Sequence, residues 1–311
     1  MNKPETLIEQ AARRLEELER AGIVVPWEAA AIGLPPPSLV APGAVAPAPV
    51  RAPAPARPIA PAYSPPAAAY SVHLDLMRLK EMGYLVPDQL RSEIAQQFRL
   101  IKRPLLKTAR GDAQPGVRRA HHIMVTSALP GEGKTFCSLN LAMSMAMEVD
   151  TGVILVDADV VRPAVFSRYG LDANELAPNG LLDYLSGSQT ALHQLLVSTN
   201  VPKLTLMSTG RSNSRSSELL SSDGMERLLD TLAEQYADHV VIFDASPVLL
   251  TTESIALAGK VGQVVVVVEN DKTPKAAVKK AFDALRHCPN VSTVLNKCEA
   301  ASLGNRYGYY Y

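Results

Sequence analysis

A glycine-rich loop around Lys134 carries the clearest chemistry in the sequence. The run from Ala128 to Thr135 reads Ala-Leu-Pro-Gly-Glu-Gly-Lys-Thr, between a predicted strand at 123–127 and a predicted helix at 134–148. Backbone N–H groups of such a loop point at phosphate oxygens, and the dipole of the following helix favours negative charge. We therefore predict a P-loop that binds a nucleotide, the alternative being a tight turn without a ligand. The residues expected to bind it are Pro130, Gly131, Glu132, Gly133, Lys134, Thr135 and Phe136.

Three aspartates follow apolar runs in positions that suit a metal site. Asp157 and Asp159 end one run, and Asp244 ends another. In a parallel sheet the carboxyl ends of the strands meet at one edge, so these carboxylates are expected to face the P-loop. A buried carboxylate is costly unless a cation accompanies it. We expect Thr135, Asp159 and Asp244 to hold Mg²⁺, directly or through water, whereas the alternative for each aspartate is a helix cap.

Four of the ten tyrosines lie in the last five residues of the sequence. They follow a segment of small and polar residues at 300–305, which predicts a flexible approach. Aromatic side chains at a chain terminus gain little from burial and are poorly explained as core. We interpret the tail at 301–311 as a set of phosphoryl acceptors, the alternative being a tail that packs on the domain or on a partner. The expected acceptors are Tyr307, Tyr309, Tyr310 and Tyr311.

The loop and the carboxylates together suit phosphoryl transfer. This reaction needs mainly positioning and electrostatic stabilisation, which Lys134 and the loop N–H groups would supply. A tyrosine hydroxyl must lose its proton near the transition state, so a base is needed. Asp157 is the expected base and Asp159 is the alternative. Arg162 is expected to steady its loop or the incoming tyrosine, or else to form a surface salt bridge.

Apolar strands alternate with helices through the second half of the chain, which is typical of α/β proteins. The predicted strands are 123–127, 153–157, 204–208, 240–244, 264–268 and 291–295. The predicted helices are 134–148, 217–236, 252–260 and 274–287. Several strands are continuous Val or Ile runs, as expected where helices cover both faces of a sheet. The predicted fold class is therefore an α/β P-loop NTPase at 121–300, with a mainly parallel twisted sheet flanked by helices on both faces.

The first 120 residues divide into three parts by composition. Residues 1–30 place leucines at helical spacing and predict an amphipathic helical segment. Residues 31–70 are rich in Pro and Ala and are expected to form a disordered linker, either a plain spacer or a docking site for proline-reading domains. Residues 71–120 are predicted to be helical, with one helix that begins near 89 and ends at Pro104. In this part we also expect a helix that stops at Gly83.

Composition excludes several classes of function. The chain has 311 residues, with 31 Lys+Arg and 31 Asp+Glu, so its formal charge is zero. This balance argues against a nucleic-acid binder, which needs a basic surplus. The three cysteines have no metal-binding spacing and favour a reduced, cytoplasmic compartment. No apolar run approaches the ~20 residues that span a bilayer, and the first residues do not resemble a signal peptide.

Three segments together resemble the motifs of the bacterial tyrosine kinases, a family of P-loop proteins. They are the P-loop, the Val-Asp-Ala-Asp-Val-Val-Arg-Pro run that ends at Pro163, and the Asp-Ala-Ser-Pro run that begins at Asp244. The resemblance implies ATP- and Mg²⁺-dependent autophosphorylation of the C-terminal tyrosines and control of exopolysaccharide export. The Pro/Ala region and residues 98–106 look most like the exosortase-associated tyrosine autokinases. One departure is Ala245-Ser246, where the family usually has Thr-Pro.

The resemblance also implies binding partners. Gln96, Arg99 and Lys102 match, with two substitutions, the family's Glu-x-x-Arg-x-x-Arg helix, which mediates ring-like self-association. Asn296-Lys297, after the last predicted strand, resembles an adenine-side element of the wider superfamily. A membrane protein of the chain-length-determinant, or polysaccharide co-polymerase, type is the implied partner, which would hold the chain at the inner membrane, and a tyrosine phosphatase is a further one. We expect phosphorylation between subunits, followed by disassembly of the oligomer as the charge of the tail grows.

Two other functions are alternatives. A ParA/MinD-like ATPase switch would hydrolyse ATP without phosphorylating itself, but those ATPases carry an extra lysine early in the loop, where this chain has Leu129. A non-catalytic partner would use a bound nucleotide only to set its shape. The intact set of Lys134, Asp157, Asp159 and Asp244 argues against that function.

Overall fold

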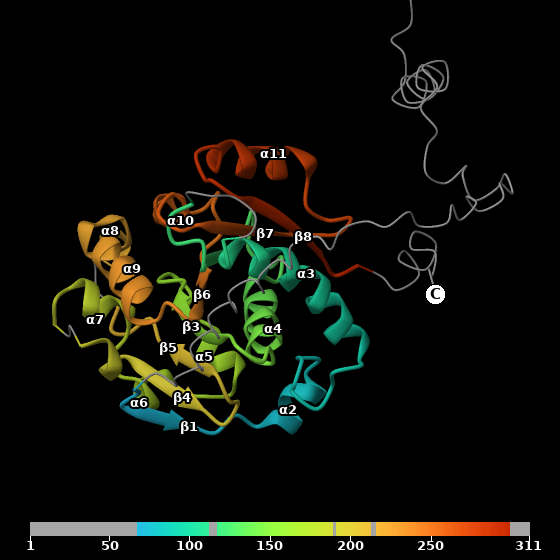
Figure 1. The fold of residues 1–311 in the computed structure, drawn as a ribbon. Coiled ribbons are helices and arrows are strands. Elements are labelled where there is room, and N and C mark those ends of the chain that lie inside the picture. Colours follow the sequence, from blue (N-terminus) through green and yellow to red (C-terminus); the bar gives the residue numbers. More distant parts are fainter. Residues whose placement is uncertain (1–66, 112–116, 189–190, 213–215, 299–311) are drawn as a thin grey trace, which may run out of the picture. The chain divides into compact units, whose positions relative to one another are not determined.

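The computed structural model describes residues 67–111, 117–188, 191–212 and 216–298, all within one compact unit of the chain (Figure 1). Its strands are β1 Tyr70–Val72, β2 His122–Ser127, β3 Gly152–Ala158, β4 Leu196–Thr199, β5 Leu204–Met207, β6 His239–Ala245, β7 Gln263–Glu269 and β8 Val291–Asn296. They form one sheet in the order β1-β4-β5-β3-β6-β2-β7-β8. Only β4 and β5 pair antiparallel among these described strands. The predicted mainly parallel sheet is therefore confirmed.

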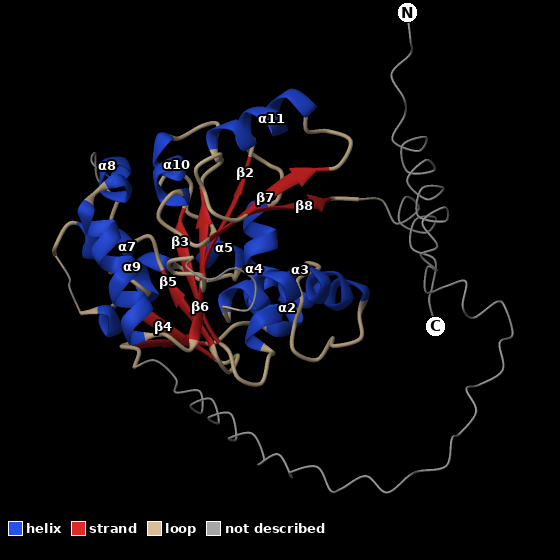
Figure 2. Cartoon of the chain, turned by 45° about the horizontal axis from the view of Figure 1, so that its top comes forward, coloured by secondary structure: helices blue, strands red, loops and turns tan. Residues whose placement is uncertain are grey.

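Helices cover both faces of the sheet (Figure 2). They are α2 Leu76–Glu81, α3 Glu93–Ala109, α4 Lys134–Ala146, α5 Val165–Arg168, α6 Ala173–Leu176, α7 Leu181–Leu185, α8 Ser216–Ser221, α9 Asp223–Gln235, α10 Thr252–Ala258 and α11 Lys275–Ala284, with a 3₁₀ helix at Leu192–Gln194. Apolar side chains of α2 to α6 pack on one face, and those of α7 to α11 pack on the other. Burial of each helix's apolar stripe against the strands stabilises this three-layer fold.

The six predicted strands all form, with ends within one residue of those expected. β3 and β6 are buried along their whole length, which explains why their sequences are apolar without alternation. Strands β1 and β4 were not predicted from the sequence. Both are short strands that complete the sheet beside β5, and short apolar runs do not distinguish a strand from a loop.

Two predicted helices differ from the structure. The helix expected to begin near 89 and to end at Pro104 begins at Glu93 and continues as α3 to Ala109, with Pro104 inside it. Proline removes one helical hydrogen bond, but burial of Leu105 and Leu106 against the sheet favours continuation. The helix predicted at 217–236 is divided into α8 and α9, because Ser222 between them has an extended backbone.

The predictions for the N-terminal part of the chain fall mostly on residues that are not described. Residues 1–66 lie outside the described part of the chain, as do residues 299–311 with the tyrosine tail. The described chain has its first strand from Tyr70, the last residue of the expected linker. The helix predicted to stop at Gly83 is confirmed as α2, which ends one residue before its cap, Met82. No described helix is long and apolar enough to cross a bilayer.

Strand order brings the predicted site together. β2 lies between β6 and β7, and β3 lies between β5 and β6. Because β3 and β6 are parallel and in register, Asp157 is paired directly with Asp244. The carboxyl ends of these three central strands meet at one edge of the sheet, where the loop after β2 also lies.

Candidate active site

The loop after β2 depends on two glycines with left-handed backbone. Gly131 has φ 85° and Gly133, the N-cap of α4, has φ 95°. A Cβ atom on Gly133 would lie 2.1 Å from Asn296 Nδ2, so a side chain has no space there. The loop therefore leads into the N-terminus of α4 with its backbone close to any bound group, which is the arrangement that binds phosphate.

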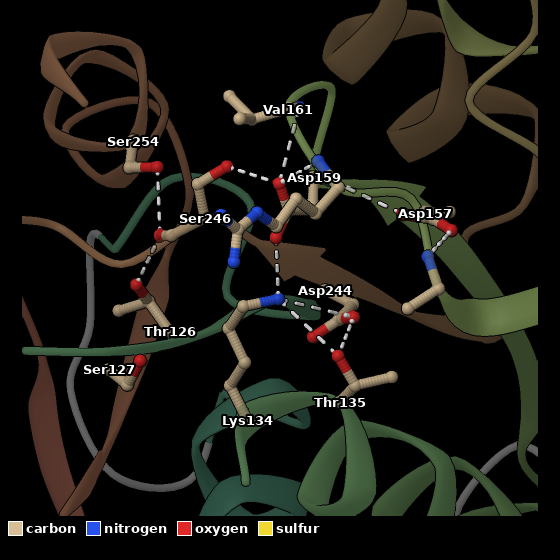
Figure 3. A network of polar contacts seen from close by, with 12 residues as sticks. Thr126, Ser127, Lys134, Thr135, Asp157, Asp159, Val161, Asp244, Ser246 and Ser254 are labelled. Carbon is tan, nitrogen blue, oxygen red and sulfur yellow. Dashed lines mark hydrogen bonds and ion pairs between the residues drawn. The ribbon is translucent and has the colours of Figure 1, made fainter. Parts of the chain in front are cut away.

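Lys134 and two aspartates form the centre of the site (Figure 3). The Nζ atom of Lys134 lies 2.7 Å from Asp159 Oδ2 and 3.7 Å from Asp244 Oδ2. Burial alone would lower the pKa of Lys134, but the two carboxylates outweigh burial and raise it. The lysine is therefore a fixed positive charge at the carboxyl edge of the sheet, and it is paired rather than free.

Asp244 is fully buried beside the first turn of α4. Its Oδ2 atom accepts from Thr135 Oγ1 at 2.7 Å, and its Oδ1 atom accepts from Ser138 Oγ at 2.9 Å. Burial raises the pKa of Asp244 even though Lys134 and the two hydroxyls oppose that rise. Its ionised form therefore depends on a nearby cation.

Four groups contact the carboxylate of Asp159, namely Lys134 and three hydrogen-bond donors. Its Oδ1 atom accepts from Ser246 Oγ at 2.6 Å and from the backbone N–H of Arg162 at 3.0 Å and Val161 at 3.3 Å. Burial alone would raise the pKa of Asp159, but the charge of Lys134 and these hydrogen bonds hold it below the ordinary value. Asp159 is therefore a carboxylate at neutral pH.

Asp157 differs from Asp159 in its partners. Its Oδ2 atom accepts from the backbone N–H groups of Ala164 and Val165, both at 2.9 Å, so it supports the turn that begins α5. Burial and the neighbouring Asp244 raise the pKa of Asp157 to about 7. The two aspartates of this motif thus have pKa values on opposite sides of the ordinary one, because only Asp159 pairs with Lys134.

Two of the predicted nucleotide-binding residues, Glu132 and Phe136, have only backbone groups left to contact a nucleotide. The carboxylate of Glu132 is buried and accepts from the N–H of Leu129 at 2.7 Å and from the Thr273 hydroxyl. The ring of Phe136 packs on Tyr84 with ring centroids 5.2 Å apart. Their side chains therefore serve the fold, whereas their N–H groups belong to the loop and to the first turn of α4. Pro130 is exposed at the loop tip.

Other predicted residues lie apart from the centre. Arg162 is exposed, and its N–H rather than its side chain contacts Asp159. Gln96 and Arg99 are exposed on α3, but Lys102 is buried and pairs with Glu148 at 2.7 Å. Lys102 is therefore not on the face that the other two share.

Two polar residues of the site, Ser138 and Ser246, were not identified from the sequence, and for Lys297 the contact with the loop was not foreseen. Ser138 lies three residues after Thr135 and so on the same face of α4, which was a usable signal. Ser246 was noted only as a departure from a motif, and its bond to Asp159 depends on the packing of β3 beside β6. Lys297 donates to the carbonyl of Gly131 at 2.8 Å, a contact that no local pattern indicates.

The oxygen ligands present suit Mg²⁺ bound together with a nucleotide. Thr135, Asp159 and Asp244 supply a hydroxyl and two carboxylates, which are ligands that Mg²⁺ prefers. Within the described residues no three His, Cys, Asp or Glu side chains form a metal site by themselves. Mg²⁺ at nucleotide sites is usually held by one or two carboxylates and by substrate phosphates rather than by a protein cage.

Comparisons with known proteins agree with this geometry. The family model of an AAA domain matches residues 120–288. Tyrosine-protein kinase YwqD of Bacillus subtilis is 30% identical over 195 residues, which cover 62% of this chain and 78% of that protein. Tyrosine-protein kinase ptk of Acinetobacter johnsonii is 36% identical over 155 residues, which cover 50% of this chain and 20% of that protein. The match thus spans a fifth of the length of ptk.

A solved structure has the same fold over its whole length. The crystal structure of the VpsO kinase domain is 28% identical with a TM-score of 0.52, and the match covers 67% of this chain and 100% of that one. This chain is therefore similar in fold to that kinase domain over the matched residues.

Proposed function

Because the chain belongs to the AAA domain family and, within it, to the bacterial tyrosine kinases, we propose that it transfers the terminal phosphoryl group of ATP to its own C-terminal tyrosines. The observation that carries this proposal is the meeting of Lys134 with Asp159 at 2.7 Å and of Thr135 with Asp244 at 2.7 Å, beside a phosphate-type loop. The acceptors are Tyr307, Tyr309, Tyr310 and Tyr311, which lie outside the described residues.

In this proposal the loop N–H groups and Lys134 bind the phosphates of ATP. Lys134 leaves its ion pair with Asp159 for the terminal phosphates, where its charge offsets the charge that develops during transfer. Thr135, Asp159 and Asp244 would hold Mg²⁺, which supplies positive charge at the phosphate oxygens. The carboxylates that Lys134 neutralises in this structure would then be neutralised by the metal.

The acceptor oxygen must be deprotonated as it attacks. The phenol oxygen forms a bond to the terminal phosphorus, the bond from that phosphorus to the bridging oxygen breaks, and ADP leaves. The phenol proton passes to Asp157. Asp157 suits this role because its pKa of about 7 is near the working pH of a general base, whereas Asp159 is a carboxylate that would hold Mg²⁺ once Lys134 has moved to the phosphates. Asp157 also lines a cavity of about 570 Å³ that a tyrosine ring would enter.

Further parts of the proposal concern assembly and place in the cell. The exposed face of α3 with Gln96 and Arg99 would contact another subunit, and Arg162 would steady the incoming tail. Asn296 would lie near the adenine.

A membrane protein of the chain-length-determinant type would recruit the chain to the inner membrane from the cytoplasmic side. A tyrosine phosphatase would reverse the reaction, and the phosphorylation state would control exopolysaccharide export.

A ParA/MinD-like ATPase switch is the second candidate function. It would need a lysine where this chain has Leu129, whose side chain instead packs against the core. No specific contact in the site favours this alternative.

The test is the fate of the terminal phosphate. The purified chain should acquire acid- and alkali-stable phosphotyrosine from labelled ATP with Mg²⁺, and intact mass should fall again after treatment with a tyrosine phosphatase. Lys134→Met should lose this incorporation, because the phosphates lose their fixed cation. ATP hydrolysis without any phosphotyrosine would refute the kinase assignment and favour the switch. Particle size measured before and after phosphorylation tests the expected disassembly.

A further inference from the structure

Two adjacent side chains at the end of β8 contact the phosphate loop. Asn296 Nδ2 donates to the carbonyl of Glu132 at 2.9 Å, and Lys297 Nζ donates to the carbonyl of Gly131 at 2.8 Å. The two carbonyls belong to consecutive peptide groups of the loop. Both contacts join residues more than 160 positions apart, so they exist only in the folded chain.

The geometry of the peptide group makes these contacts relevant to phosphate binding. The structure has no cis peptide bonds among the described residues, and in a planar trans peptide the C=O and the following N–H point in opposite directions. A donor that holds the carbonyl of Gly131 therefore directs the N–H of Glu132 to the other side of the loop. The carbonyl of Glu132 fixes the N–H of Gly133 in the same way.

We propose that Asn296 and Lys297 are positioning residues that aim the N–H groups of Glu132 and Gly133 at the nucleotide phosphates. This inference rests on the proposed nucleotide binding and goes beyond it, because it assigns the preorganisation of the loop to the end of β8. Preorganised N–H dipoles bind charge without reorganisation when the ligand arrives, which is why their orientation affects affinity.

Further contacts surround the two donors. Lys297 has a left-handed backbone with φ 58°, a strained conformation that persists only where neighbouring contacts fix it. Its ammonium also pairs with Glu269 at 3.0 Å, and Glu269 pairs in turn with Lys272 at 3.1 Å. Asn296 lies directly against Gly133, as the absence of space for a Cβ atom there indicates.

Lys272 provides a matched control. It shares the carboxylate of Glu269 with Lys297, and its removal also deletes one positive charge. Lys297 also donates to the carbonyl of Gly131, whereas the ammonium of Lys272 pairs with Glu269. Comparing Lys297→Met with Lys272→Met in the full chain therefore separates loop positioning from the general field of the charges.

The experiment measures the Kd of ADP with Mg²⁺ together with KM and kcat for ATP. We expect Lys297→Met to raise Kd and KM about fivefold, which corresponds to about 1 kcal/mol, with kcat within about twofold of the unaltered chain. Lys297→Arg should restore most of the affinity, and Lys272→Met should leave it nearly unchanged. Thermal midpoints measured in parallel should stay close to that of the unaltered chain.

A second probe separates the effect of Asn296 on the loop from any contact of Asn296 with adenine. Inorganic tripolyphosphate has no adenine, so Asn296→Leu should weaken its competition with ADP if Asn296 acts through the loop. Unchanged affinity in Lys297→Met, an equal loss in Lys272→Met, or unchanged tripolyphosphate binding in Asn296→Leu would overturn the inference while leaving the kinase assignment intact. A chain that binds no ADP at all would overturn both.

Discussion

Ser246 is a residue at which this chain departs from the usual family motif, and its hydroxyl is part of the site. It donates to Asp159 at 2.6 Å, while its carbonyl accepts from Thr126 and Ser254 hydroxyls at 2.7 and 2.9 Å. The loop after β6 is therefore fastened to β2 and α10. Hydrogen bonds to a charged group contribute more than neutral ones, so this contact is expected to orient the carboxylate of Asp159.

We predict that Ser246→Ala lowers kcat/KM for autophosphorylation about tenfold, because Asp159 loses a hydrogen bond worth about 1.5 kcal/mol. Ser246→Thr keeps a hydroxyl and should retain most of the activity. The measurement is the initial rate of phosphotyrosine formation over a range of ATP concentrations. If alanine and threonine variants perform equally, the hydroxyl does not orient Asp159.

His122, at the start of β2, makes stability depend on pH. Its side chain is fully buried, packs edge-on against Phe243 with centroids 6.0 Å apart, and has no hydrogen-bond partner for either ring nitrogen among the described residues. Burial, with smaller effects from the nearby His121 and Arg119, lowers the pKa of His122 to about 2. The folded chain therefore keeps this ring neutral at pH values where the unfolded chain protonates it.

Stability should consequently fall as pH drops below about 6.5, since the unfolded state then binds a proton that the folded state does not. From pH 7.5 to 5.5 one such histidine costs about 1.4 kcal/mol of unfolding free energy. Chemical denaturation at both pH values should show that the drop in unfolding free energy is smaller by about 1.4 kcal/mol for His122→Leu than for the unaltered chain. The surface variant His193→Gln is the control. Equal pH slopes for His122→Leu and the unaltered chain would contradict the prediction.

Helix α3 has two faces with different tasks. One side buries Phe98, Leu105 and Lys102, and the ammonium of Lys102 bonds the carbonyl of Ser144 at 2.5 Å and pairs with Glu148 at 2.7 Å. Gln96 and Arg99 of the same helix are exposed to solvent. Lys102 therefore joins α3 to the end of α4, whereas Arg99 is available to another subunit.

Substitution on each face should give a different defect. Lys102→Ala is expected to lower the unfolding free energy by about 1–3 kcal/mol, because it leaves buried acceptors without a donor, although Glu148 remains partly accessible to water. Lys107→Ala, at an exposed position of the same helix, should change it little. Denaturant titration measures both. A Lys102→Ala chain as stable as the unaltered one would mean that the buried ion pair contributes nothing net.

Arg99→Glu should leave the unfolding free energy nearly unchanged but reduce the oligomer, since it reverses a charge at the proposed contact between subunits. Light scattering over a range of protein concentrations measures this effect. An unchanged particle mass would place the contact between subunits elsewhere on the molecule.

At the scale of the whole molecule, the question is which subunit phosphorylates which tail. β8 lies four strands from β3, which corresponds to about 19 Å across the sheet. The ten residues from Lys297 to Tyr307 span up to about 33–36 Å when extended. Length alone therefore permits a tail to reach its own site, and an experiment must separate this route from transfer between subunits.

We expect transfer between subunits. A chain with Lys134→Met but an intact tail should acquire phosphotyrosine when mixed with an active chain that ends at residue 300 and has no acceptor. The rate should rise with the concentration of the active partner. Phosphotyrosine that forms only when active site and tail belong to one chain, at a rate independent of dilution, would show that the reaction is intramolecular.

Much of this protein follows from local sequence. Six strands, the P-loop and the three aspartates were predicted because apolar runs, glycine spacing and acidic strand ends are each visible within a few residues. The topology rule that parallel strands end at one edge then sufficed to place Lys134 near Asp159 and Asp244. By contrast, α3 continues through Pro104 because burial of Leu105 and Leu106 outweighs a local preference, which no local pattern reveals.

The sequence by itself determined which residues could do chemistry, whereas the tertiary structure decided their pKa values, their burial and their partners. Asp157 and Asp159 are two residues apart and chemically identical, yet their pKa values move in opposite directions because packing pairs only one of them with Lys134. Lys102 matched a surface motif but is buried, and Asn296 and Lys297 meet the loop from the far end of the chain. These properties depend on burial and on contacts between distant residues, which arise only when the sheet has assembled.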